Sequence, residues 1–246
     1  MTWSLITLGL GWLAGSFLGL LSLRLPRGEP VGMSRSACQS CGRTLGLFDL
    51  VPIVSFIALR GRCRTCGSAI PRRYIALEVA CLGLAAWALW RFDGPLAFWS
   101  ACLAWQLLLL AILDVEHLWL PRVLTLPLIG SGLAVSMTFG LARGADSLIG
   151  AVAGFMSLAA VAWAYRRFRG REGLGGGDAY LFAGSGAWVG WMGLPSVLLI
   201  AAASGLAVVG LAALVRRPIR TDQPIPFGAF LALATWLVWL YGPLGG

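Results

Sequence analysis

Two aspartates at the edges of apolar segments carry the side chains best suited to catalysis. Asp114 ends one apolar run, and Asp178 follows three consecutive glycines and precedes another. Two carboxyl groups within hydrogen-bonding reach cannot both ionise, so such a pair shares a proton near neutral pH. One carboxylate can then activate water while its protonated partner polarises a scissile carbonyl group, which predicts aspartic proteolysis. The alternative is a structural role, because an aspartate at a helix start is most often a cap.

Four cysteines form a second pattern with chemical meaning. Cys38 and Cys41 make one C-x2-C pair, and Cys63 and Cys66 make another after an interval of 21 residues. Each pair can present two thiolates from a tight turn, and two pairs complete a tetrahedral shell around Zn²⁺. Four protein ligands leave no position for water, so the metal would be structural. The alternative is a pair of disulfides or free thiols, although a reducing cytoplasm disfavours disulfides.

These residues belong to a chain that is too apolar for a water-soluble protein. Of its 246 residues, 59% are hydrophobic and 12% are charged, against about 25% charged in soluble domains. The apolar runs, uncharged apart from Glu78 in the second, are 3–23, 75–90, 95–113, 124–141, 148–165, 179–191, 195–215 and 227–240. They predict an all-α polytopic membrane protein with about eight transmembrane helices. In the first run, Gly11, Gly15 and Gly19 are spaced for a close helix contact.

The distribution of basic residues predicts the orientation of these helices. Alternate connections hold 17 of the 19 basic residues, whereas the opposite side holds Arg91 and Arg143. Cytoplasmic loops are enriched in basic residues, so the arginine-rich side should face the cytoplasm and both termini should lie outside it. We expect residues 1–23 to form the first transmembrane helix, 24–74 a cytoplasmic four-cysteine zinc-binding domain, and 75–246 a transmembrane peptidase core.

A third acid, Glu78, lies inside the second apolar run. Ionisable residues at membrane depth are functional candidates, because placing a charge there is expensive. The simpler interpretation is a partner for an arginine such as Arg73, or an interhelical hydrogen bond. Cys81 and Cys102 also fall in apolar runs, and we expect them to be packing residues.

Several short motifs occur in a fixed order along the chain. They are GSFL at 15–18, RLP at 24–26, the two C-x2-C pairs, PRRY at 71–74 with Glu78, Asp114 followed by LPRVLTLP, EGLGGGD at 172–178 and PFGAFLALA at 226–234. This set resembles the bacterial prepilin peptidases, also called type IV leader peptidases, over nearly the whole chain.

The resemblance implies a polytopic aspartic protease of the GxGD type in the bacterial inner membrane. Such enzymes cut the short basic leader from type IV prepilins or pseudopilins at the cytoplasmic face. The resemblance assigns the catalytic roles to Asp114 and Asp178 and the metal-ligand roles to the four paired cysteines. Many members also N-methylate the new N-terminus with S-adenosylmethionine, for which no binding residues are marked in this sequence. The expected partners are prepilin-like substrates, and no nucleic acid is expected.

Three positions depart from the family pattern. Gly19 stands where GSFLN would place Asn, Arg122 where LPD would place Asp, and Tyr180 where GGGDVK would place Lys. None of them removes a candidate catalytic carboxylate. Arg122 supports the choice of Asp114, because the other acid of that loop is absent here. Gly19 and Tyr180 bear more on methyl transfer than on cleavage.

A basic leader raises an electrostatic problem, because the arginine-rich face would repel it. Glu116 lies two residues after Asp114, and Glu172 lies six residues before Asp178. We hypothesise that these two glutamates hold the basic leader residues while the surrounding arginines engage anionic lipid headgroups. The alternative is that both are solvated loop acids paired with nearby arginines such as Arg171.

Two other classes of function compete with proteolysis on the residues alone. A proton-coupled transporter can use membrane-border carboxylates as relays, but its acids should lie near the midplane around an internal repeat. No such repeat is evident in the sequence. A non-catalytic zinc-bearing membrane scaffold would explain the cysteines and the helices, yet it leaves the glycines before Asp178 without a reason.

Overall fold

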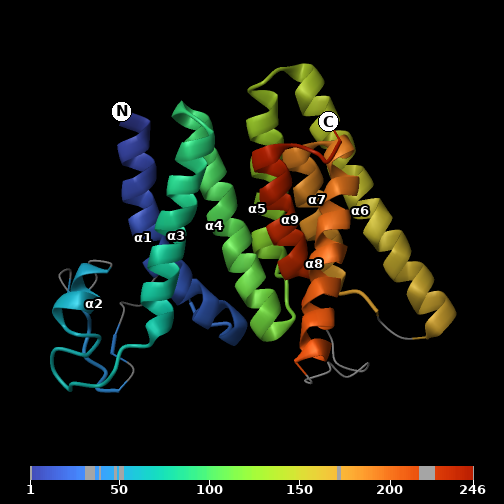
Figure 1. The fold of residues 1–246 in the computed structure, drawn as a ribbon. Helices are drawn as coiled ribbons and strands as arrows, with labels where there is room; N and C mark the ends of the chain where they lie inside the picture. Colours follow the sequence, from blue (N-terminus) through green and yellow to red (C-terminus); the bar gives the residue numbers. More distant parts are fainter. Residues whose placement is uncertain are drawn as a thin grey trace. The chain divides into compact units, whose positions relative to one another are not determined.

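The computed structural model describes residues 2–30, 37–38, 40–46, 49, 53–170, 173–215 and 225–245. Within these ranges the regular elements are helices, apart from two isolated β-bridges, so the predicted all-α class is confirmed. The helices follow one another as shown in Figure 1: α1 (Thr2–Arg24), η1 (Leu25–Arg27), α2 (Val54–Ala58), α3 (Arg72–Arg91), α4 (Gly94–His117), α5 (Arg122–Met137), α6 (Leu141–Arg169), α7 (Gly176–Val189), η3 (Trp191–Gly193), α8 (Leu194–Leu214) and α9 (Phe227–Tyr241).

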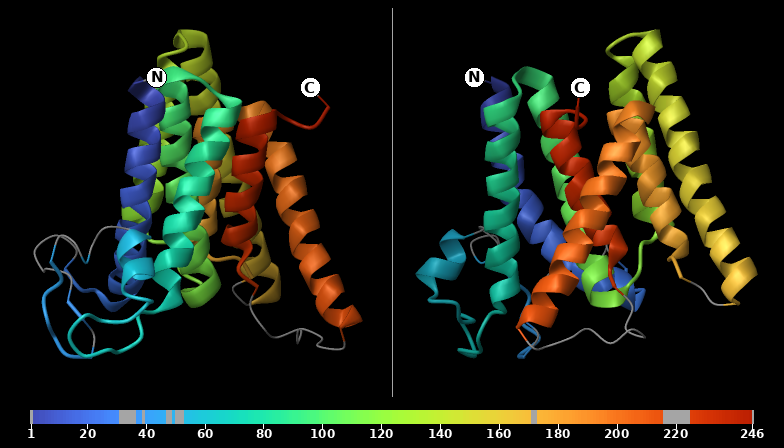
Figure 2. Two further views of the ribbon diagram at one scale, coloured as in Figure 1. Left: turned by 60° about the vertical axis from the view of Figure 1, so that its left-hand side comes forward. Right: turned by 45° about the vertical axis from the view of Figure 1, so that its right-hand side comes forward.

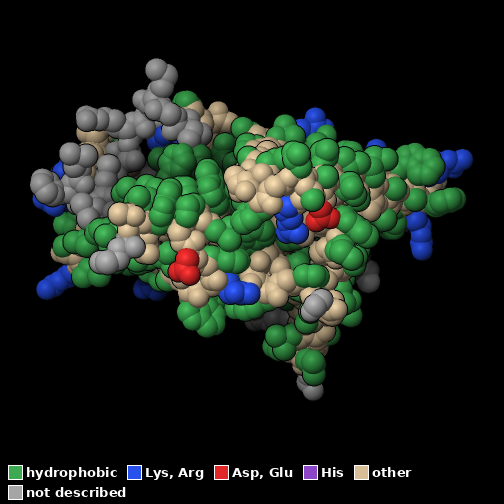
Figure 3. Space-filling view, turned by 90° about the horizontal axis from the view of Figure 1, so that it is seen from above, with side chains coloured by type: hydrophobic (Ala, Val, Ile, Leu, Met, Phe, Trp, Pro, Cys, Tyr) green, Lys and Arg blue, Asp and Glu red, His purple; other side chains and the backbone are tan. Residues whose placement is uncertain are grey.

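Five segments among the described residues are long and apolar enough to cross a membrane. They are Thr2–Arg27, Arg72–Arg91, Gly94–His117, Leu141–Arg169 and Trp191–Leu214. Helices α5, α7 and α9 have 16, 14 and 15 residues, whereas a span needs about 20. The predicted count of eight spans is therefore not confirmed. Large apolar side chains are exposed on the helices, which suits contact with lipid. Hydrophobic side chains also cover much of the surface seen from above in Figure 3.

The chain divides into two compact units inside α4, after Trp105. In the first unit, α1 and α3 lie side by side, as the views of Figure 2 show. A methyl group added at Gly15 would overlap the backbone of Glu78, and Gly11 and Gly19 also face α3 at close range. The helix contact predicted from the spacing of these glycines is confirmed.

Helix α7 is the most enclosed helix of the second unit, where it contacts α5, α6 and α9. Nearly all of its residues from Asp178 to Trp188 are buried. A methyl group added at Gly186 would overlap the backbone of Gly150 in α6. The indole N–H of Trp188 donates to the Leu128 carbonyl oxygen of α5 at 3.0 Å. These contacts hold α7 firmly and thereby fix the position of the aspartate at its start.

Candidate catalytic and metal sites

Asp114 lies one turn before the end of α4, and its side chain is buried. Its Oδ2 accepts a hydrogen bond of 2.9 Å from the backbone N–H of Ala229, the third residue of α9. The first N–H groups of a helix have no partner within the helix and carry partial positive charge. The start of α9 is therefore a favourable neighbour for this carboxyl group.

Asp178 is the third residue of α7 and is buried as well. Its Oδ2 accepts the backbone N–H of Gly175 at 3.0 Å, and its own N–H donates to the Gly175 carbonyl oxygen at 3.1 Å. This reciprocal pair caps the first turn of α7. The capping role that the sequence offered as an alternative is present, and it leaves the second carboxyl oxygen available for chemistry.

Leu120, in the connection after α4, lies against the starts of both α7 and α9. A Cβ added at Gly177 would lie 2.5 Å from the Leu120 Cβ, and one at Gly228 would lie 2.7 Å from the Leu120 Cδ1. A Cβ at Gly177 would also meet the Leu120 backbone, so that position requires glycine, whereas a Cβ at Gly228 would make the Leu120 side chain shift. The turn toward Leu120 begins at Leu118, whose φ of 51° is left-handed. This role of Leu120 could not be predicted from the sequence, because the contact joins residues that are distant along the chain.

The carboxyl groups of Asp114 and Asp178 are near enough to interact electrostatically. Asp114 lies near the end of α4, and Asp178 lies in the first turn of α7. Two acids that are 64 residues apart in the sequence thus share one buried region of the second unit.

Two of the three positions that depart from the family pattern meet beside this region. The guanidinium of Arg122, at the start of α5, stacks on the ring of Tyr180 in α7. The same ring also contacts Phe155 of α6, with centroids 5.0 Å apart in an edge-on arrangement. The pair therefore connects α5 to α7 two residues beyond Asp178.

The three glutamates of the sequence analysis have different surroundings. Glu116 is 38% exposed in the last turn of α4, 3.8 Å from the imidazole of His117. Glu172 lies outside the described residues. Glu78 is buried in α3, accepts the backbone N–H of Ile53 at 2.6 Å and is hydrogen-bonded to Ser16 of α1. The predicted interhelical hydrogen bond of Glu78 is confirmed, and its bond to Ile53 was not foreseen.

The four paired cysteines converge in the first unit. Their sulfur atoms all lie within 4.8 Å of one another, and those of Cys38 and Cys66 are 3.8 Å apart. A tetrahedral zinc with Zn–S bonds of about 2.3 Å would place its sulfurs about 3.8 Å apart. All six cysteines of the chain are free thiols in this structure, which does not support the disulfide alternative. The donor set and its spacing fit a zinc ion.

The two C-x2-C segments, called knuckles from here on, repeat one local structure. In each, the first cysteine donates its N–H to a carbonyl five residues later and accepts the N–H of the residue four positions on. That residue is Gly42 in one knuckle and Gly67 in the other, each with a φ of 69°. Glycine adopts this left-handed conformation without strain. The C-x2-C-G sequence therefore specifies the turn that presents both thiols.

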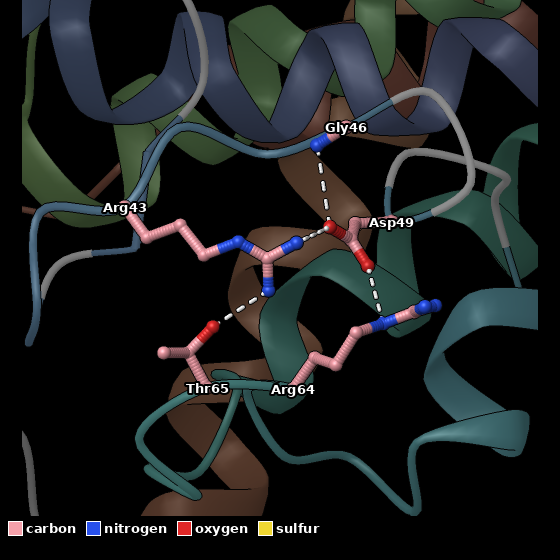
Figure 4. Close-up of polar contacts among 5 residues, drawn as sticks. All are labelled: Arg43, Gly46, Asp49, Arg64 and Thr65. Atoms are coloured by element: carbon pink, nitrogen blue, oxygen red, sulfur yellow. Dashed lines mark hydrogen bonds and ion pairs between the residues drawn. The ribbon is translucent and has the colours of Figure 1, made fainter.

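Polar side chains connect the two knuckles, as Figure 4 shows. The carboxylate of Asp49 forms ion pairs with Arg43 and Arg64, which belong to different knuckles. The hydroxyl oxygen of Ser68 lies 3.6 Å from the Cys38 sulfur and 3.1 Å from the Cys66 sulfur. Sequence reasoning missed Asp49, although the arginines beside both knuckles were a signal for an acid nearby.

The first unit also contains a cavity of about 380 Å³ beside the knuckles. Its lining includes the apolar Leu20, the aromatic Phe56 and Tyr74, and the acidic Asp49 and Glu78. Mixed apolar and polar walls with a volume of this order are typical of small-molecule sites.

Comparison with known proteins adds independent information on the whole chain. The family model of the bacterial peptidase A24 N-terminal domain matches residues 10–92, and that of the type IV leader peptidase family matches residues 101–210. No solved structure matches the chain.

Curated relatives named prepilin leader peptidase/N-methyltransferase align over most of the chain. The protein of Burkholderia pseudomallei (strain 1026b) is 42% identical over 91% of this chain and 80% of its own length. That of Pseudomonas aeruginosa is 37% identical over 97% and 90%, and that of Aeromonas hydrophila 39% over 85% and 72%. With its apolar helices, the chain is a multi-pass membrane protein. These matches show that it is a peptidase and belongs to the type IV leader peptidase family.

Proposed function

We propose that this chain is an aspartic endopeptidase that removes the basic leader from type IV prepilins or pseudopilins. The strongest support is a pair of buried, interacting carboxyl groups in the second unit. That of Asp114 lies near the end of α4, and that of Asp178 lies at the start of α7. The names of the relatives supply the substrate class. Membership of the peptidase family disfavours both the transporter and the non-catalytic scaffold.

In the proposed reaction the two carboxyl groups hold one proton between them. The ionised one removes a proton from water, and the hydroxide attacks the scissile carbonyl carbon. The protonated one donates a hydrogen bond to the carbonyl oxygen as negative charge develops there. The C–N bond then breaks, and the departing amine takes up the proton that came from water. The N–H groups of Ala229 and Gly175 orient the two carboxyl groups throughout.

Two charged features suit a basic leader at an arginine-rich membrane face. Glu116 is exposed and two residues from Asp114, so it can attract basic leader residues near the scissile bond. We assign the same role to Glu172, which lies outside the described residues. The arginines of this face would bind anionic lipid headgroups. Glu116→Gln should slow cleavage of basic leaders more than cleavage of neutralised leaders, and the difference should shrink with added salt.

The topology of the enzyme follows from the same proposal. We infer that α5, α7 and α9 cross the membrane with the five longer segments, giving eight spans. Short apolar helices can span when neighbours bury them or when the bilayer thins locally, and α7 is nearly enclosed by protein. The arginine count supports a cytoplasmic position, at the inner membrane, for residues 24–74 and for the catalytic site. Residues 1–23 would be the first span, and 75–246 would carry the peptidase chemistry.

We also propose that the four knuckle cysteines bind one structural zinc ion. The sulfur positions support this, because they match the edge of a tetrahedral zinc–thiolate shell. Bound zinc would hold together a polar segment too small to fold around a core of its own. Its four ligands come from the protein, so hydrolysis is left to the aspartates.

A second activity is supported by the relatives' names, which include N-methyltransferase. We propose that the cavity of the first unit binds S-adenosylmethionine, whose methyl group is the reagent for the newly exposed amine. Phe56 and Tyr74 offer aromatic faces to a sulfonium cation, and Glu78 places a carboxyl group in the lining. Titration calorimetry with Phe56→Ala should show weaker cofactor binding at unchanged peptidase activity.

The proposed function is tested by incubating the purified full-length protein with a prepilin-like peptide and weighing the products. Cleavage at one bond after the basic leader supports the peptidase. A further mass increase of one methyl group, only with S-adenosylmethionine, supports the second activity. An intact peptide in every condition would contradict the substrate assignment.

A further inference from the structure

The two knuckles come from separate parts of the chain, and their four thiols converge only when the knuckles are held next to each other. Each knuckle orders its own pair of thiols through its backbone turn. No backbone hydrogen bond of the turns themselves joins one knuckle to the other among the described residues. The relative placement of the two thiol pairs therefore depends on side chains.

Asp49 supplies the connection at the centre of Figure 4. Its Oδ2 lies 3.0 Å from Nη2 of Arg43, which follows Cys41 and Gly42 in the first knuckle. Its Oδ1 lies 3.2 Å from Nε of Arg64, between the cysteines of the second knuckle. One carboxylate thus contacts both knuckles, one oxygen to each.

Two further hydrogen bonds fix this carboxylate and its partner. The backbone N–H of Gly46 donates to Oδ2 of Asp49 at 3.2 Å. The guanidinium of Arg43 also donates through Nη1 to the Thr65 hydroxyl oxygen at 2.7 Å, so Arg43 reaches the second knuckle directly. Because a guanidinium is planar and rigid, two bonds from it fix both direction and distance.

Burial indicates that this arrangement is more than an exposed ion pair. The Asp49 side chain is 7% exposed, whereas those of Arg43 and Arg64 are 34% and 56% exposed. Exposed ion pairs contribute little, but a carboxylate this buried needs its partners to offset lost hydration. Oδ2 of Asp49 accepts hydrogen bonds from Arg43 and Gly46, whereas Oδ1 is held by the Arg64 ion pair, without a hydrogen bond among the described residues.

We propose that Asp49 is a positioning residue for the zinc site: it holds the two knuckles so that their four thiols converge before the metal binds. This inference rests on the proposed zinc site. Groups outside the ligand shell that orient the ligands commonly change metal affinity by about 10- to 100-fold when removed. Arg43 and Arg64 also bring positive charge toward a site that becomes anionic with four thiolates around Zn²⁺.

The test measures zinc affinity of the full-length protein in detergent by competition with a chromophoric chelator. Asp49→Asn is nearly isosteric and keeps an acceptor for Gly46, but it loses the charge that holds both arginines. It should bind zinc about 10- to 100-fold more weakly. The matched control is Glu29→Gln, because Glu29 pairs at 3.8 Å with Arg27 on the exposed surface and does not connect the knuckles. The control should keep the parental affinity.

A second variant separates positioning from general damage. Thr65→Val removes the acceptor of the second Arg43 bond and should weaken zinc binding less than Asp49→Asn does. The double variant should lose less zinc affinity than the product of the two single fold-losses, because both changes act through Arg43. Circular dichroism should show the same helix content in all variants.

The outcomes distinguish this inference from the proposal on which it rests. If the parental protein binds no zinc, the zinc site fails and this inference fails with it. If the parent binds zinc and Asp49→Asn binds it equally well, the zinc site stands and the positioning role is wrong. Equal weakening by Glu29→Gln would likewise contradict a role specific to Asp49.

Discussion

The guanidinium carbon of Arg122 lies 4.9 Å from the centroid of the Tyr180 ring, so two residues that depart from the family pattern contact each other. A cation over an aromatic face is attracted by the ring quadrupole. The contact connects the start of α5 to the start of α7, close to Asp178. The two departures are thus coupled in space, and each supplies the partner of the other.

Loss of this stacking should reduce activity through the position of Asp178. A cation–π contact near the surface is worth about 0.5–1 kcal/mol, which corresponds to about a two- to fivefold change in rate. We expect Tyr180→Ala to lower kcat/KM by that factor, and Tyr180→Phe, which keeps the ring, to retain activity. Rates of leader release measured by mass spectrometry test this prediction, and equal rates for Tyr180→Ala and the parental protein would contradict it.

Replacing the cation–π contact by an ion pair provides the control for Arg122 and Tyr180. Arg122→Asp alone loses the cation, and Tyr180→Lys alone places two cations together. The double variant creates an ion pair at the same place and should recover activity relative to either single change. Additive losses in the double variant would show that the two side chains act independently.

The proton shared by the aspartates predicts a bell-shaped pH profile. Cleavage requires one protonated and one ionised carboxyl group. Activity should fall on the acid side because both groups become protonated, and on the alkaline side because the shared proton is lost. Both limbs belong to the pair rather than to either residue. A kcat/KM that is constant from acid to alkaline buffer would contradict proton sharing.

The adjacent Gly176 and Gly177 offer a matched test of how Asp178 is positioned. A Cβ at Gly177 would lie 2.5 Å from the Leu120 Cβ, whereas one at Gly176 would meet nothing within 4 Å. Overpacking of this kind typically costs about 1–3 kcal/mol. We expect Gly177→Ala to lower both thermal stability and cleavage, and Gly176→Ala to be tolerated. Similar effects of the two changes would mean that the contact with Leu120 does not position Asp178.

Removal of the metal should lower the melting temperature of the protein before it reduces the cleavage rate. The purified protein should contain one zinc per chain, and Cys→Ser at any knuckle position should release it. Melting temperature should then drop, with activity lost only as the protein unfolds, because a four-thiolate shell leaves no site for a reacting water. Cys102→Ser, in α4, is the control and should keep its zinc. Freshly prepared protein without zinc would contradict the metal site.

Much of the fold was readable from the sequence because uncharged runs are long and distinct. The predicted start of one helix was wrong. The run expected to begin at residue 148 belongs to α6, which begins at Leu141 and includes two charged residues in its first turns. Arg143 and Asp146 pair with each other at 3.4 Å one turn apart, so their charges do not end the helix. The short helix α2 was missed because five residues give no periodic signal.

The candidate site was partly readable for a similar reason. Cysteine pairs and a glycine-preceded aspartate are local patterns, and their spacing already indicates chemistry. The contributions of Leu120 and Asp49 depend on contacts between segments distant in the sequence. Nothing in the residue types around Leu120 distinguishes it from the other leucines of the chain.

The most direct test of the proposed catalytic pair is the rate of leader cleavage in Asp114→Asn and Asp178→Asn. Asparagine is nearly isosteric with aspartate but can neither share the proton nor act as a base, so each change should slow cleavage by about a hundredfold or more. Zinc content and helix content should stay parental. Asp93→Asn, at an exposed position, should cleave normally. Parental cleavage rates in either of the first two variants would contradict the catalytic pair.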